Sequence, residues 1–185
     1  VPSGNFPAIA YASSGSTGKS TFWFRNKEQE KHASESHEVI VKDVYGIKKA
    51  EPTLVIICFS MGVWVAGNSE AAGFSSLTEK GYNFTTITPG IEKKDILNIL
   101  KTIAPFYKHV ILAGYPPFIS DCLHAAKDEK INLKGLKILT AGDTFTEHWR
   151  ETAMMLGDIK NPSHIINVYG CADASMLGHE TPLSI

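Results

Sequence analysis

The sequence lacks an excess of charge of either sign, and it lacks any long apolar run. Its 185 residues include 18 lysines and arginines and 19 aspartates and glutamates, which leave a formal net charge of −1. This balance lacks the excess of positive charge that attracts nucleic acid or an anionic membrane, so neither is expected as a partner. No apolar run reaches the length of a membrane-spanning helix. We expect one α/β domain or subdomain over residues 1–185, long enough to bury a sizeable core.

Cysteines are few and unsuited to pairing. The three, Cys58, Cys122 and Cys171, are odd in number and widely spaced, with neither a disulfide framework nor a metal-binding spacing. We therefore expect reduced thiols in a cytoplasmic protein. The chain begins at Val1 and stops at Ile185 without an obvious cap or tail, so we also expect it to be a fragment of a longer protein.

Strand-like and helix-like segments alternate along the chain. Short apolar runs rich in β-branched residues predict strands at residues 6–12, 54–59, 83–88, 109–113, 136–140 and 164–169. Charge patterns, small residues, helical spacing and start signals predict helices at residues 25–45, 64–71, 92–103, from 116 onward and about 144–156. In the last of these, Thr144 and Glu147 have the spacing of a capping box. The alternation predicts an α/β fold, with a mostly parallel sheet and helices on both faces.

Three polar, glycine-containing stretches each follow a predicted strand. They are Ser13–Thr21, Ala141–Asp143 and Gly170–Asp173. Ligands of parallel sheets bind beyond the carboxyl ends of the strands. We therefore expect the three stretches to meet at one edge of the sheet and to form one site.

The stretch Ser13–Thr21 carries the donors that a phosphate needs. Its glycines let the backbone turn with N–H groups pointing inward, and its hydroxyls and Lys19 add further donors. It is not a Walker A loop, because that pattern needs a glycine five positions before Gly18, where this chain has Ser13. The alternative is a mobile serine- and glycine-rich linker.

In detail the stretch resembles the phosphate loop of the adenylate-forming superfamily, whose usual form is [ST]-[ST]-G-[ST]-T-G-x-[PS]. Tyr169–Asp173 is similar to the Y-G-x-T-E motif of that superfamily, and Leu139–Asp143 stands where the family carries a G-G-[AE] turn. The resemblance runs from about Tyr11 to Ile185 and is closest to the phenylacetate–CoA ligase branch. It implies a fragment of the large N-terminal domain, without the mobile C-terminal lid domain.

The resemblance also implies an activity. A carboxylic acid would be activated by ATP to an acyl-adenylate and then transferred to a thiol such as coenzyme A, with Mg²⁺ as cofactor and no protein nucleophile. The partners implied are small molecules, and a homo-oligomer is compatible with the pattern. The implied nucleotide-binding residues are Ser14, Gly15, Ser16, Thr17, Gly18, Lys19, Ala141, Gly142, Asp143, Tyr169 and Gly170. The implied metal ligand is Asp173, and the implied acyl-pocket residues are Trp64, Gly67 and Tyr115.

Other hypotheses stay open at this point. A serine hydrolase is one, because Cys58–Gly62 places Ser60 directly after a predicted strand, as in a G-x-S-x-G nucleophile elbow. Cys58 replaces the first glycine of that motif, and Asp143 with His164 or His179 would complete the triad.

A catalytically degenerate nucleotide-binding module is another hypothesis, because Ala172 and Asp173 stand where the family has threonine and glutamate. Asp173 could also be a simple helix N-cap. Trp64 could equally pack in the core. His179 and Glu180 fit a solvated polar pair better than metal ligands, since no third ligand is placed.

Overall fold

The computed structural model describes residues 9–13 and 18–185. Its centre is a six-stranded sheet with the order β4-β3-β5-β6-β7-β8. The strands are β3 (Thr53–Cys58), β4 (Phe84–Ile87), β5 (His109–Gly114), β6 (Leu136–Ala141), β7 (Ile165–Cys171) and β8 (Ser175–His179). All neighbours are parallel except β7 and β8, which form an antiparallel hairpin. The predicted α/β class with a mostly parallel sheet is confirmed, and only β8 of this sheet was not predicted.

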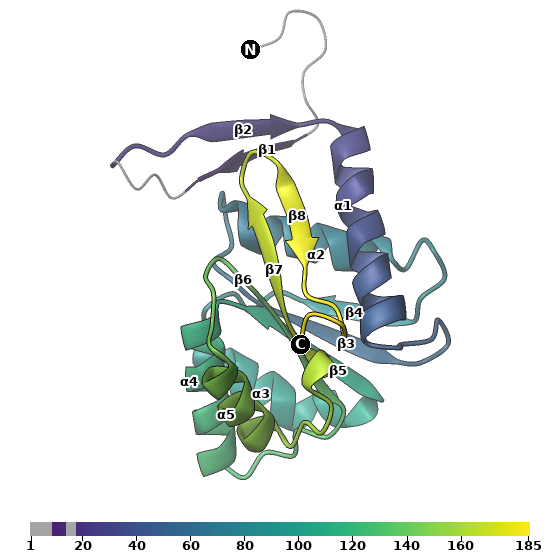
Figure 1. Cartoon of the computed structure of the whole chain (residues 1–185), viewed down its shortest axis with the longest axis vertical. Coiled ribbons are helices and arrows are strands. Elements are labelled where there is room, and N and C mark those ends of the chain that lie inside the picture. The colour runs from purple at the N-terminus through teal and green to yellow at the C-terminus, as the bar shows by residue number, and fades with distance from the viewer. Residues whose placement is uncertain (1–8, 14–17) are drawn as a thin grey trace, which may run out of the picture.

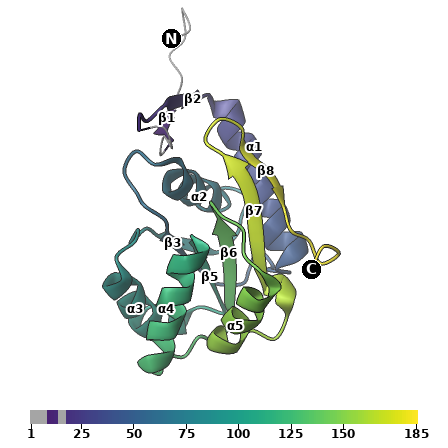
Figure 2. The ribbon, with the colours of Figure 1, turned by 60° about the vertical axis from the view of Figure 1, so that its left-hand side comes forward.

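Helices cover both faces of the sheet (Figures 1 and 2). One face carries α3 (Lys93–Thr102), α4 (Pro116–Asp128) and α5 (Glu147–Gly157), and the other carries α1 (Lys27–Val39) and α2 (Val65–Ser76). Short helical turns complete the fold: η1 (Ile40–Val44), η2 (Ala104–Phe106) and η3 (Pro162–His164). No helix in the described part of the chain has the length and hydropathy of a membrane span.

Strand β3 shows why its sequence is an unbroken apolar run. All six of its residues are buried. Leu54 and Ile56 point into the core that contains α3 and α4, whereas Val55 and Ile57 point into the core on the side of α1 and α2. A strand covered on both faces has no solvated side, so it cannot alternate apolar and polar residues.

The N-terminal strands correct one expectation. The predicted first strand, described from Ile9 to Ala12 as β1, does not join the main sheet. It pairs antiparallel with β2 (Phe22–Arg25) in a separate two-stranded sheet. Figure 1 shows this ribbon lying across the tip of the β7–β8 hairpin. An antiparallel partner needs only a short connection, whereas a parallel place in the main sheet would need a long crossover.

Helix α5 corrects a second expectation. The spacing of Thr144 and Glu147 predicts that Thr144 caps the helix, but Thr146 is the N-cap and its hydroxyl accepts a hydrogen bond from the Trp149 backbone N–H. Thr144 remains in the loop because its own N–H donates to the Asp143 carboxylate at 2.8 Å. Of the two threonines that could cap the helix, Thr146 does so, and α5 begins at Glu147.

Candidate functional site

A cavity of about 700 Å³ lies at the carboxyl edge of the parallel strands. It is bordered by the β1–β2 hairpin, the segment after β3, the start of α4, the loop after β6 and the turn between β7 and β8. Its wall includes Ser13, Trp64, Tyr115, Ala141, Gly142, Gly170, Cys171 and Ala172. Parts of all three polar stretches singled out in the sequence therefore border one cavity.

The phosphate-loop stretch is described only at its two ends. Ser14, Gly15, Ser16 and Thr17 lie outside the described residues. On one side the Ser13 backbone N–H donates to the Thr21 carbonyl at 2.9 Å, which continues the hairpin pairing. On the other side Gly18 has a φ of +89°, a conformation that favours glycine, and Lys19 is exposed. Ser13 and Thr21 thus extend the β1–β2 pairing one step beyond Ala12 and Phe22.

Two hydrogen bonds dock this hairpin at the site, one from each of its ends. The Ala12 backbone N–H donates to the Val63 carbonyl at 2.8 Å. The Arg25 guanidinium donates through Nη2 to the Ala172 carbonyl at 2.8 Å. Arg25 is buried, with its guanidinium 5.2 Å from the ring centroid of Tyr11. The hairpin thus reaches the sheet edge by docking, although β1 is not a strand of that sheet.

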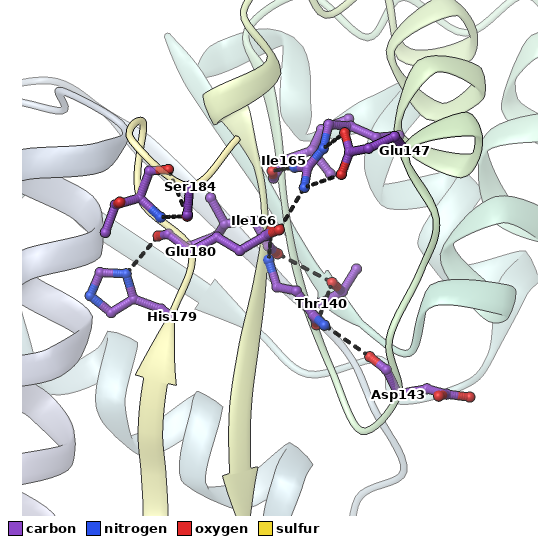
Figure 3. Close-up of polar contacts among 11 residues, drawn as sticks. Thr140, Asp143, Glu147, Ile165, Ile166, His179, Glu180 and Ser184 are labelled. Carbon is purple, nitrogen blue, oxygen red and sulfur yellow. Dashed lines mark hydrogen bonds and ion pairs between the residues drawn. The ribbon is translucent and has the colours of Figure 1, made fainter.

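The loop after β6 is held by its own aspartate. The Tyr115 hydroxyl donates to the Asp143 carboxylate at 3.2 Å, and this hydrogen bond raises the pKa of Tyr115. The Asn167 side-chain amide donates to the Asp143 carbonyl at 3.1 Å (Figure 3). Gly142 has a φ of +90°, which lets the chain turn beside the cavity. The Asp143 side chain therefore positions this loop, while Ala141 and Gly142 border the cavity.

A partly buried network behind this loop gives Glu180 a structural role. One carboxylate oxygen of Glu180 accepts from Arg150 at 2.7 Å, and the other accepts from the Asn167 backbone N–H at 2.7 Å (Figure 3). The Thr140 hydroxyl donates to the Asn167 side chain at 3.0 Å. The His179 ring donates to the Glu180 carbonyl at 2.7 Å. The interpretation of His179 and Glu180 as a solvated pair was therefore wrong for Glu180, which ties β7 to α5.

Tyr169 and Asp173 lie at the margin of the site. Tyr169 is 72% exposed and borders a separate, smaller cavity of about 430 Å³. Asp173 lies exposed in the turn between β7 and β8, next to Ala172 of the main cavity wall. The helix N-cap alternative for Asp173 is wrong, because a hairpin turn follows β7 and Ser175 leaves it with a φ of +64°. In residues 9–13 and 18–185, no group of three or more His, Cys, Asp or Glu side chains could hold a metal ion.

The three acyl-pocket residues divide into two kinds. Trp64 and Tyr115 border the cavity, so Trp64 is not a core residue. Gly67 lies in α2 and is not among the residues that border the cavity. A Cβ atom at Gly67 would lie 2.5 Å from the Ser60 carbonyl oxygen. Glycine is needed there because α2 passes close to the segment after β3.

The hydrolase alternative finds no support in the geometry. Ser60 has no left-handed backbone, and α2 begins only at Val65, so the strained strand-to-helix elbow is not formed. Among the described residues, Ser60 makes no hydrogen bond to a histidine. His164 precedes β7, at the opposite edge of the parallel strands from Ser60. His179 uses its Nδ1–H for the Glu180 carbonyl.

Sequence reasoning missed one polar pair in the cavity wall. His37 of α1 and Glu70 of α2 both border the cavity, and their Nε2 and Oε2 atoms are 2.9 Å apart. The two residues are 1% and 7% exposed. They are 33 positions apart on two helices, so no local spacing links them. The one local sign is a glutamate inside a helix otherwise rich in small residues.

Comparison with known proteins shows which solved structures share this fold. No protein family and no curated protein matches the sequence, but solved structures do. A 2-hydroxyisobutyryl-CoA ligase in complex with 2-HIB-AMP and CoA superposes with a TM-score of 0.71 at 16% identity, over 95% of this chain and 39% of that chain. The fold of this chain is the fold of part of an acyl-CoA ligase.

Two further acyl-CoA synthetases show the same likeness. For the enzyme from Brucella canis the TM-score is 0.62 at 13% identity, over 94% of this chain and 29% of that one. For an acyl-CoA synthetase (AMP-forming)/AMP-acid ligase II-like protein from Dyadobacter fermentans the TM-score is 0.57 at 16% identity, over 93% of this chain and 43% of that one. The chain therefore spans less than half of the length of each of these three structures.

Proposed function

We propose that this chain is the nucleotide- and acyl-binding part of an adenylate-forming acid–CoA ligase of the phenylacetate–CoA ligase type. The observation that carries the proposal is the convergence of three motif-bearing stretches on one cavity, in a fold shared with acyl-CoA ligases. Solved structures with this fold hold 2-HIB-AMP and CoA, which supports an acyl-adenylate and CoA as ligands here.

In this proposal the chain's residues bind and orient rather than attack. The stretch from Ser14 to Lys19 holds the β- and γ-phosphates, the backbone at Ala141 and Gly142 borders the adenine, and Trp64 and Tyr115 border the acyl group. The substrate carboxylate attacks the α-phosphate, pyrophosphate leaves, and the thiol of CoA then takes the acyl group with release of AMP. Catalysis comes from positioning and from charge stabilisation, without a protein nucleophile.

Asp173 fits the role of a magnesium ligand in its chemistry. Its carboxylate is exposed beside the cavity wall and makes no hydrogen bond to another described residue. One carboxylate together with phosphate oxygens and waters is a donor set that Mg²⁺ accepts. When bound, Mg²⁺ supplies neutralisation of phosphate charge. The shorter stem of aspartate, compared with glutamate in the family motif, is compatible with an inserted water.

Acid-dependent ATP–pyrophosphate exchange by the full-length gene product tests the proposal. Asp173→Glu should retain exchange within roughly tenfold, an energy of about 1.4 kcal/mol. Asp173→Asn should lose on the order of a hundredfold, because the ion loses its charged protein ligand. Asp158→Asn is the matched control, since Asp158 is an exposed aspartate at the end of α5. It should leave exchange unchanged.

Two outcomes would contradict parts of the proposal. Equal exchange by the wild type and Asp173→Asn removes Asp173 from the metal site. An absence of exchange with every acid tried, in a protein that still binds ATP, favours the degenerate nucleotide-binding module, for which Ala172 and Asp173 are the sequence argument.

A further inference from the structure

The cavity wall carries one polar pair that the proposed function does not use. His37 projects from α1 and Glu70 from α2, and they meet at 2.9 Å between Nε2 and Oε2. The second ring nitrogen of His37, Nδ1, lies 2.7 Å from the Ala33 carbonyl oxygen. Both side chains are almost fully removed from solvent, yet both border the cavity.

With Glu70 ionised, the hydrogen-bond partners of His37 determine its protonation. A carbonyl oxygen and a carboxylate oxygen both accept, so both ring nitrogens of His37 must donate. His37 is then an imidazolium paired with the Glu70 carboxylate. Burial lowers the pKa of His37, but the charge and hydrogen bond of Glu70, with the hydrogen bond to the Ala33 carbonyl, raise the pKa overall. The pair is therefore neutral as a whole.

The surroundings hold the ring in one place. The Phe74 ring packs edge-on against His37, with centroids 4.8 Å apart. Gly73 leaves room for the imidazole, because a Cβ atom there would lie 2.4 Å from its Cε1 atom. Since His37 is held on two sides and bonded at both nitrogens, it orients the Glu70 carboxylate.

One oxygen of Glu70 is left over. Oε1 makes no hydrogen bond to another described residue, and it is not among the fully enclosed polar atoms that lack a partner. Glu70 borders the cavity, and Oε1 is the carboxylate oxygen that His37 does not occupy. The neighbouring wall is largely apolar and includes Phe59, Val65, Ala66 and Met176. An oriented acceptor in an apolar wall binds a hydrogen-bond donor more strongly than the same group does in water.

We propose that Glu70 Oε1 is a specificity subsite for a hydroxyl group on the tail of the substrate acid. This inference rests on the proposed function for the position of the acyl group. A neutral donor fits better than an ammonium, because His37 already neutralises Glu70 and a buried substrate cation would have no counter-charge. Glu70 thus favours hydroxylated carboxylic acids over their unsubstituted parents, and His37 is the positioning residue.

Calorimetry with the full-length gene product, without ATP, tests the subsite directly. The probes are phenylacetate and butyrate, each compared with its monohydroxylated isomers, and 4-aminobutyrate. At least one hydroxy isomer should bind tenfold or more tightly than its parent. In Glu70→Gln this ratio should fall several-fold, because the amide N–H₂ that then faces the cavity can only donate to the hydroxyl oxygen, in a neutral hydrogen bond weaker than the one a hydroxyl donates to a carboxylate. Ser69→Ala, from the same helix and cavity wall, should keep the ratio.

Each other result overturns a separate statement. Parents that bind as tightly as all their hydroxy isomers overturn the subsite, whatever the folding of the variants. If 4-aminobutyrate binds more tightly than the hydroxy isomers, the neutral-donor assignment is overturned. If the affinity ratio of hydroxy isomer to parent is lost in Ser69→Ala but kept in Glu70→Gln, the subsite is Ser69 and not Glu70. Pyrophosphate exchange, measured with the same acids, separates the two proposals. Its absence overturns the ligase function, whereas a hydroxyl preference in calorimetry still upholds the subsite.

Discussion

Two shielded histidines differ in protonation because their neighbours differ. His37 faces a carboxylate, which raises its pKa despite burial. His164, next to the edge of the Tyr45 ring, has no carboxylate partner among the described residues. Burial, with the positive charges of Lys137 and His109, lowers the pKa of His164 to about 4. The carboxylate therefore favours the charged ring at His37, whereas burial favours the neutral ring at His164.

The lowered pKa of His164 predicts a loss of stability in acid. Between pH 6.5 and about 4 the unfolded chain binds a proton at His164 that the folded chain does not, so the free energy of unfolding falls as pH falls through this window. His164→Gln should reduce this fall by on the order of 1–3 kcal/mol. Urea unfolding at pH 7 and pH 4.5 measures it.

The control for this prediction is His148→Gln. The side chain of His148 is 90% exposed, so its substitution should leave the pH dependence as in the wild type. A His164→Gln variant whose stability falls with pH as steeply as that of the wild type would contradict the prediction.

At the scale of elements, the start of α5 tests a cap assignment. Thr146→Ala should lower the free energy of unfolding by about 1 kcal/mol, because the hydroxyl accepts from the Trp149 N–H. Thr144→Ala should change it by less than about 0.5 kcal/mol, since only its backbone N–H is used, toward Asp143. Denaturant unfolding compares the two variants. A larger loss of unfolding free energy in Thr144→Ala than in Thr146→Ala would show that Thr144 is the cap, as its spacing predicts.

The main helices and parallel strands were predictable because burial dictates their patterns. Strand β3 is apolar throughout since both its faces are covered, and α3 places Ile96 and Leu100 on one buried face. Strand β8, Ser175–His179, was missed because it contains a glycine and no fully buried residue, so it has no apolar run. The pairing of β1 with β2 was missed because a strand of four residues does not indicate which partner it will take.

At the scale of the whole molecule, the position of the cavity was predictable in outline. The rule that ligands bind at the carboxyl edge brought Ala141, Gly142 and Gly170 to one cavity. The β1–β2 hairpin, which carries Ser13, reaches that edge by a different route, through hydrogen bonds to the carbonyls of Val63 and Ala172. The pair of His37 and Glu70 could not be predicted, because tertiary packing of two helices creates it.

ATP binding to the full-length gene product tests the central claim most directly. Isothermal titration should show ATP binding in the wild type and none measurable when Ser16, Thr17 and Lys19 are all changed to alanine. The thermal transition should stay nearly unchanged, because loop substitutions that remove donors leave the buried core intact. Unaltered ATP binding by the triple variant, or no binding by the wild type, would contradict the assignment of this chain as a nucleotide-binding domain.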